Sequence, residues 1–141
     1  MSQENVENLR AYLEQWNGER LRPEARPGEV FDLVLLDPNV VYEDANLPDH
    51  AGEPYRGHEG VVRAMERWIE PFEWMVIDLE QVIDAGDRLV SIHQWRAKAQ
   101  HTNIEFDAPL AYLWTFRDGK VIHFRSFLNP KQALEAVGLA E

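Results

Sequence analysis

The sequence predicts an α+β fold in which a curved antiparallel sheet wraps around N-terminal helices and leaves a conical pocket. Apolar residues recur at helical spacing in two stretches before Pro71, whereas four stretches after it alternate between apolar and polar residues. The length of 141 residues is that of one domain, so we assign residues 1–141 to a single unit. Because strands this long must curl, their apolar face encloses the helices and leaves space at the wide end.

The first helix is indicated by apolar residues that share one stripe, namely Val6, Leu9, Leu13 and Trp16. Asn17-Gly18 ends this helix. Residues 19–29 are rich in proline and arginine and lack an apolar period, which predicts a surface loop. Residues 29–36 then form a short helix or an extended segment that stops at Asp37-Pro38.

The next elements are a short strand, a loop and a second helix. The strand runs through Val40 and Val41 to residue 44, and residues 45–57 are a loop punctuated by proline, glycine and aspartate. The second helix covers residues 57–70 and ends at Pro71. It carries on one face Val61, Ala64, Met65 and Trp68.

Four strands and a final helix complete the chain. The strands are expected over residues 73–85, 88–100, 103–117 and 120–128. Asp118-Gly119 between the last two strands is a strong hairpin signal. Asn129 caps the last helix, Pro130 occupies its first position, and Gly138 follows its end.

Composition excludes several classes of partner. The net charge of −11 repels phosphate backbones and anionic lipid, so we expect neither nucleic acid nor membrane as a partner. The chain has no cysteine, which removes disulfides, thiolate nucleophiles and thiolate zinc sites. Its first residues are polar and acidic, unlike a signal peptide, and its apolar runs are too short to cross a bilayer. These features predict a soluble, cytoplasmic protein.

The short strand ends in a Tyr-Glu-Asp sequence, which is unusual for a strand made for burial. Because side chains alternate along a strand, Tyr42 and Asp44 share one face and Glu43 takes the other. We expect Asp44 to point inward at the mouth of the pocket. A carboxylate in an apolar cavity has its charged form disfavoured, which suits a general base. A solvated strand end or a turn cap is the structural alternative.

Three stretches resemble one known superfamily: residues 54–65 (PYRGHEGVVRAM), 112–130 (YLWTFRDGKVIHFRSFLNP) and 132–139 (QALEAVGL). They are similar to the SnoaL-like branch of the nuclear transport factor 2-like superfamily, which includes ketosteroid isomerase, limonene epoxide hydrolase and polyketide cyclases. The resemblance implies the cystatin-like cone, a curved sheet closed around a conical pocket. It specifies function poorly, because one fold hosts many reactions.

The resemblance to ketosteroid isomerase implies a base and a hydrogen-bond donor. That enzyme has an aspartate base and an oxyanion hole made of a tyrosine and a protonated aspartate. The position of the base matches Asp44, and the tyrosine matches Tyr12, five residues before Asn17. Ala111 stands where the second acid is expected, so we expect negligible steroid isomerisation. A packed core tyrosine is the structural alternative for Tyr12.

The other relatives match less completely. Limonene epoxide hydrolase uses an Asp-Arg-Asp set, and Ser126 stands where its final aspartate would lie, with Gln94 and Arg96 on the adjacent strand. The polyketide cyclases place a basic aspartate on later strands, which Glu105 and Asp107 match too loosely to carry over. The histidines show no metal-ligand pattern, so we expect no metal and no cofactor.

The aromatic residues predict an apolar pocket and a dimer. Alternation places Leu113, Phe124 and Ser126 on the pocket face. The opposite, outer face is expected to carry five residues, namely Trp95, Tyr112, Trp114, Arg125 and Phe127. An apolar outer face with no helix left to cover it predicts a homodimer through that face.

We therefore predict acid–base chemistry of an isomerase, cyclase or hydrolase type on a small apolar organic molecule. Asp44 would be the base and Tyr12 a donor. The residues expected to contact the ligand are Trp16, Tyr42, Met65, Trp68, Gln94, Arg96, Leu113, Phe124 and Ser126. The alternative is a non-catalytic ligand-binding or dimerisation module on the same fold. The two differ in the polar content of the pocket, because an enzyme needs converging polar groups.

Overall fold

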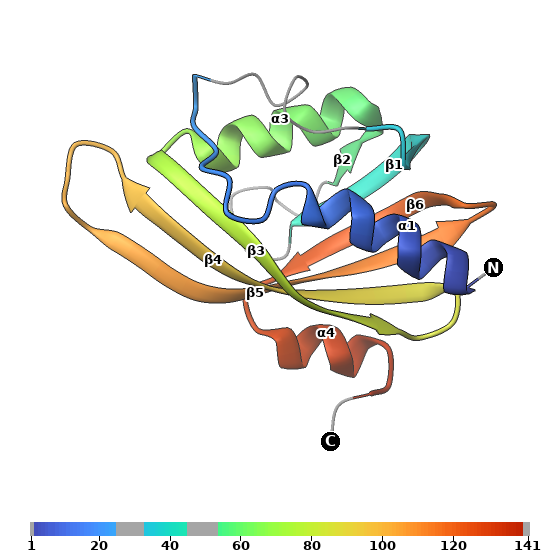
Figure 1. The fold of residues 1–141 in the computed structure, drawn as a ribbon. Coiled ribbons are helices and arrows are strands. Elements are labelled where there is room, and N and C mark those ends of the chain that lie inside the picture. The colour runs from blue at the N-terminus through green and yellow to red at the C-terminus, as the bar shows by residue number, and fades with distance from the viewer. Residues whose placement is uncertain (1, 25–32, 45–53, 140–141) are drawn as a thin grey trace.

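The computed structural model describes residues 2–24, 33–44 and 54–139. Figure 1 shows helices α1 (Ser2–Glu14) and α3 (Gly57–Ile69) on one face of a six-stranded sheet, and α4 (Pro130–Ala136) on the other. The strands are β1 (Leu36–Asp44), β2 (Tyr55–Arg56), β3 (Phe72–Asp84), β4 (Arg88–Ala99), β5 (Glu105–Arg117) and β6 (Lys120–Phe127). The predicted α+β cone is confirmed, and much of the two long loops expected before α3 lies outside the described residues.

The sheet is mixed, whereas the sequence predicted a purely antiparallel one. The strand order is β2-β1-β6-β5-β4-β3, and the four C-terminal strands form the expected antiparallel meander. β1 lies beside β6 and runs parallel to it, because the chain between them crosses over through α3 and the meander. This pairing brings the end of β1 next to the end of β6, with Asp44 opposite Ser126.

The two N-terminal helices fill the concave face of the sheet. α1 buries Leu9 and Leu13, and α3 buries Val61 and Ala64 together with the last residue of the helix, Ile69. These positions follow the helical spacing seen in the sequence, so burial of an apolar stripe explains why both segments are helical. In the described part of the chain, neither these helices nor α4 has the length and apolar character needed to span a membrane.

A β-bulge in β6 determines which side chains face the helices. Phe116 pairs with Val121 but Thr115 pairs with His123, so Ile122 is an extra residue on β6. One extra residue shifts the register of the two strands by one, which exchanges the faces of all later side chains. Uninterrupted alternation from the Asp118-Gly119 turn would place Leu113 on the face of Phe124 and Ser126. The structure places Tyr112 opposite Ser126, and Trp114 opposite Phe124.

The predicted assignment of the sheet faces is therefore wrong for β4 and β5. Tyr112 and Trp114 pack in the core cluster beneath α1 and α3, with Trp95 against it. Leu113 and Phe127 lie on the outer face with Val90 and Ala111, where Ala133 of α4 covers them. The same register places Ala111 on the outer face, so the pocket-facing neighbours of the expected acid position are Leu110 and Tyr112.

The rest of the outer face carries a polar network in place of an aromatic surface. Arg96 donates to Asp78, Gln94 donates to Asp107, and Lys98 donates to Glu73 across neighbouring strands. α4 also covers the apolar part, contrary to the expectation that no helix remained for it. Of the aromatic residues that motivated the predicted homodimer, Trp95, Tyr112 and Trp114 thus lie on the concave face, and Phe127 is covered by α4.

Candidate functional site

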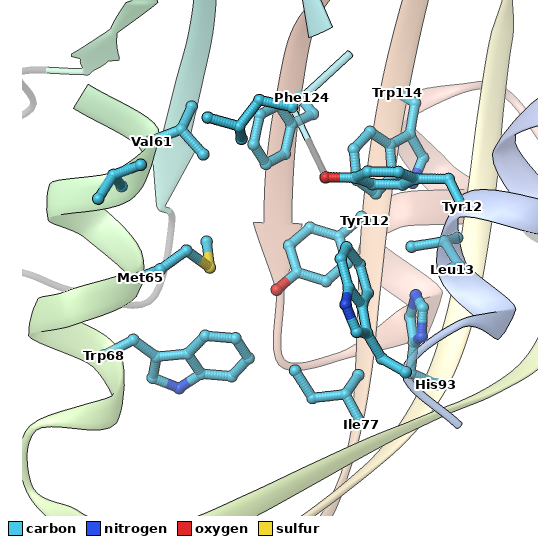
Figure 2. A pocket seen from close by; sticks show the side chains of 13 residues that line it. Tyr12, Leu13, Val61, Met65, Trp68, Ile77, His93, Tyr112, Trp114 and Phe124 are labelled. Atoms are coloured by element: carbon cyan, nitrogen blue, oxygen red, sulfur yellow. The ribbon is translucent and has the colours of Figure 1, made fainter. Parts of the chain in front are cut away.

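A cavity lies between the two N-terminal helices and the sheet, and we call it the inner cavity (Figure 2). Its volume is about 50 Å³. Three aromatic rings of the wall pack on one another, since Trp114 stacks on Phe124 at 4.8 Å and Tyr12 meets Trp114 edge-on. The lining residues are Tyr12, Leu13, Trp16, Leu33, Val61, Val62, Met65, Trp68, Ile77, His93, Tyr112, Trp114 and Phe124.

A second cavity adjoins the first at the ends of β1 and β6, and we call it the Asp44 cavity. Its volume is about 150 Å³. The lining residues are Tyr42, Asp44, Trp68, Trp95, Leu110, Tyr112, Ser126 and Leu128. Trp68 and Tyr112 line both cavities, so these two side chains form the wall between them. Among the described residues, no lysine or arginine lines either cavity.

Asp44 ends β1 with its carboxylate in the wall of the cavity named after it. Ser126 Oγ donates to Asp44 Oδ1 at 3.0 Å, and Tyr42 Oη donates to Ser126 Oγ at 3.1 Å. The parallel pairing of β1 with β6 explains this arrangement, because it places residues 44 and 126 side by side. Glu43, one residue earlier, points to the opposite face and accepts from His123 Nε2 at 2.7 Å. These two hydrogen bonds, from Tyr42 to Ser126 and from Ser126 to Asp44, fix the orientation of the Asp44 carboxylate.

Tyr112 is a central side chain of the site that sequence reasoning assigned to the outer face. Burial raises the pKa of its phenol well above the usual range, and nearby Asp44 and Tyr12 raise it further. The hydroxyl therefore stays neutral and can donate a hydrogen bond. Figure 2 shows it pointing toward Met65 and Trp68 on α3. Within the described residues it has no hydrogen-bond partner, which leaves it available to a ligand.

Tyr12 and Tyr42 contribute two more hydroxyls to the site. Tyr12 lies on α1 edge-on to Trp16, with ring centroids 4.7 Å apart, and its hydroxyl points across the inner cavity toward α3 (Figure 2). Tyr42 stacks on Phe124 at 4.4 Å. Burial raises the pKa of Tyr42, with further contributions from Tyr112 and Asp44. Tyr42 is therefore a neutral phenol that donates to Ser126.

A buried polar group lies behind the aromatic wall of the inner cavity. Ser91 Oγ lies 2.7 Å from His93 Nε2 and accepts from Trp114 Nε1 at 2.8 Å. Burial lowers the pKa of His93 from 6.5 to about 4, so the imidazole is neutral at pH 7. Its ring meets the ring of Tyr112 edge-on. Ser91 and His93 thus support the two aromatic side chains that face the ligand space.

Three residues predicted to contact a ligand lie on the other side of the sheet. Gln94 and Arg96 alternate with His93 and Trp95 on β4, so they point outward into the polar network with Asp107 and Asp78. Leu113 points outward because of the bulge in β6 and packs beneath α4. The other predicted ligand contacts, from Trp16 to Ser126, line one or both cavities.

Comparison with known proteins identifies the family. Residues 9–124 match the SnoaL-like domain. The chain belongs to the SnoaL-like domain family. The comparison with curated proteins found no match to this SnoaL-like domain. In the described residues of the domain, no group of three histidine or acidic side chains could hold a metal ion.

Solved structures share the fold at low sequence identity. A nuclear transport factor 2-like protein of unknown function from Burkholderia pseudomallei has a TM-score of 0.70 and 18% identity, over 96% of this chain and 98% of that one. A protein described as a SnoaL-like polyketide cyclase from Jannaschia sp. CCS1 has a TM-score of 0.69 and 20% identity, over 99% and 95%. A protein with a ketosteroid isomerase-like fold from Catenulispora acidiphila, in complex with trimethylamine, has a TM-score of 0.64 and 18% identity, over 93% and 92%. These likenesses establish the fold and leave the activity open.

Proposed function

We propose that this SnoaL-like domain is an acid–base enzyme that moves a proton on a small, neutral, largely apolar molecule. Asp44 is the base, and Tyr112 donates a hydrogen bond to an oxygen of the substrate. The observation that carries the proposal is that both groups line the Asp44 cavity, together with the aromatic rings of Tyr42, Trp68 and Trp95. Converging polar groups in an apolar cavity are typical of an active site.

The proposed reaction removes a proton from a carbon next to a carbonyl group. Asp44 takes this proton, and the electron pair of the C–H bond moves toward the carbonyl oxygen. The negative charge that develops there is stabilised by the neutral O–H of Tyr112, which burial and Asp44 keep protonated. In a substrate with a carbon–carbon double bond next to that carbon, return of the proton from Asp44 to the far end of the resulting dienolate completes an isomerisation. Its return to the same carbon restores the substrate.

Two further residues position the base. Ser126 donates to one carboxylate oxygen of Asp44, and Tyr42 holds the Ser126 hydroxyl in place. A carboxylate held in a fixed orientation beside the substrate meets the geometric requirement for a general base. The absence of lysine and arginine from the described walls of both cavities favours a neutral substrate over an anionic one.

The second candidate is a binding module without catalysis. Aromatic faces beside a carboxylate also suit an alkylated ammonium ion, because such a cation is attracted to aromatic rings. The relative from Catenulispora acidiphila in complex with trimethylamine makes trimethylamine a sensible probe for this alternative. A module of this kind would bind the amine and would leave the C–H bonds of ketones unchanged.

Hydrogen–deuterium exchange separates the two candidates. The bicyclic ketone 2-tetralone is incubated with the protein in D2O, and deuterium at the carbons beside its carbonyl is followed by NMR. We expect exchange above the buffer rate, and we expect Asp44→Asn to reduce the protein-dependent rate by about a hundredfold or more. Asp107→Asn is the matched control, because that carboxylate lies on the outer face beside Gln94. Binding of trimethylamine without any acceleration of exchange would replace the enzyme proposal with the binding module.

A further inference from the structure

The two cavities share a wall whose two members differ in how firmly they are held. Tyr112 lies on β5, a strand paired on both sides, and its ring packs against those of His93, Trp114 and Phe124. Trp68 lies near the end of α3 and is only partly buried. Its indole stacks on Trp95 with centroids 6.1 Å apart, and in the described part of the chain it makes no hydrogen bond. Trp68 is therefore the less buried member of the wall, and Tyr112 is the one fixed in the middle of the sheet.

The polar groups of the site are divided between the cavities. Tyr12 and His93 line the inner cavity alone, whereas Asp44 and Ser126 line the Asp44 cavity alone. A ligand confined to one cavity meets a subset of these groups. A ligand that passes the Trp68 wall meets Tyr12 at one end, Asp44 at the other and Tyr112 between them.

The cavity volumes favour such a ligand. An apolar cavity of about 150 Å³ is roughly the size that holds benzene. The Asp44 cavity has about that volume and the inner cavity about 50 Å³, so each accommodates at most about one ring while Trp68 stays in place. Stacked aromatic walls on both sides of Trp68 favour flat ring systems over flexible chains.

We infer that the two cavities are compartments of one binding site and that Trp68 is the movable partition between them. A neutral ligand that has an oxygen acceptor and more than one ring then enters only when the Trp68 indole moves. The acceptor receives the hydrogen bond of Tyr112. This inference rests on the proposed function for the identity of the site, and it adds the residue that limits the size of the ligand. Trp68 is then a specificity-determining residue that sets the length of ligand the protein accepts.

The structural test uses a variant that binds without turnover. Crystals of Asp44→Asn are soaked with 2-tetralone, and the expected result is ligand density in both compartments with the Trp68 indole displaced from Trp95. Density confined to one compartment, with Trp68 stacked on Trp95 as it is here, would overturn the inference. So would the absence of binding by calorimetry up to millimolar 2-tetralone.

A solution test measures selectivity for ligand size. Calorimetry gives the dissociation constants of cyclohexanone and 2-tetralone for the wild type and for two matched variants, Trp68→Phe and Trp74→Phe. The quantity compared is the ratio of the constant for cyclohexanone to the constant for 2-tetralone. If the open position of Trp68 is a minor state, weakening the partition should raise this ratio by about tenfold. Trp74→Phe should leave the ratio unchanged, because Trp74 packs under Arg20 and lines neither cavity. An unchanged ratio in Trp68→Phe would overturn the partition.

The outcomes separate this inference from the proposed function. Ligand density across both compartments, without deuterium exchange in the wild type, would support the elongated site and refute the enzyme. Asp44-dependent exchange, with 2-tetralone held entirely in the Asp44 cavity and Trp68 unmoved, would support the enzyme and refute the partition.

Discussion

The concave and outer faces of the same three strands have opposite characters. On the concave face, β4, β5 and β6 present aromatic rings around a few polar groups, including His93, Tyr112 and Ser126. On the outer face they present a small apolar cluster under α4 and pairs of charged or amide side chains. Strand alternation generates both faces, and the bulge at Ile122 decides which one receives the helices. Whether one residue of a strand is accommodated as a bulge can therefore decide which side chains face the candidate site.

Phe127→Ala tests whether α4 and the outer cluster form a genuine core. Phe127 is 5% exposed and packs with Ala133 of α4, so its truncation should cost about 3–5 kcal/mol of unfolding free energy. Phe106, which is 42% exposed at the open end of the concave face, is the matched aromatic control, and Phe106→Ala should cost about 1 kcal/mol or less. Equal losses in the two variants would mean that α4 does not cover the outer face in solution.

The pH dependence of stability should report the buried histidine of the concave face. Because burial lowers the pKa of His93 from 6.5 to about 4, the unfolded chain takes up a proton between these values and the folded protein does not. The stability that the folded protein gains from a neutral, buried His93 is fully present above pH 6.5 and is lost as the pH falls toward 4. It amounts to about 3 kcal/mol at most.

Denaturation of the wild type and His93→Gln at pH 7 and pH 4.5 isolates this contribution. The wild type should lose about 2–3 kcal/mol more than His93→Gln does between the two pH values. His101→Gln, which changes an exposed histidine of the β4–β5 turn, should behave as the wild type does. The same pH slope in His93→Gln and the wild type would contradict the burial of a neutral imidazole.

Arg96→Ala should have the smallest effect. The Arg96–Asp78 pair lies on the outer face with side chains 47% and 33% exposed, and exposed pairs of this kind contribute about 1 kcal/mol or less. Removal of the guanidinium should leave the binding of 2-tetralone and the deuterium exchange unchanged, because Arg96 lines neither cavity. A tenfold loss of ligand affinity would restore the sequence-based interpretation of Arg96 as a ligand contact.

Local patterns in the sequence were sufficient for most of the fold. Alternation located all four strands of the meander, and helical spacing located α1 and α3. Side-chain alternation also placed Tyr42 and Asp44 correctly on one face of the sheet, because β1 continues without a break from Val41 to Asp44. The grouping of Trp95 with Tyr112 and Trp114 was correct too, since β4 and β5 pair without a bulge.

The side of the sheet on which this group lies could not be read from alternation. Alternation relates residues along one strand, and the register across the β5–β6 turn depends on whether a bulge follows it. The hairpin signal at Asp118-Gly119 located the turn without revealing the extra residue at Ile122. For this reason Tyr112 was missed as a site residue and Leu113 was included. A signal existed in α4, because the buried Ala133 requires an apolar outer face beneath it.

Tyr112→Phe, compared with Leu113→Val, tests most directly the claim that the concave face carries the chemistry. These neighbours on β5 point to opposite faces, one into both cavities and the other beneath α4. The measurement is the rate of Asp44-dependent deuterium incorporation into 2-tetralone. Loss of the Tyr112 hydroxyl should reduce this rate by about a hundred- to a thousandfold, the usual effect of removing one oxyanion donor, while Leu113→Val should leave it within about twofold. Equal rates in the two variants would contradict the account.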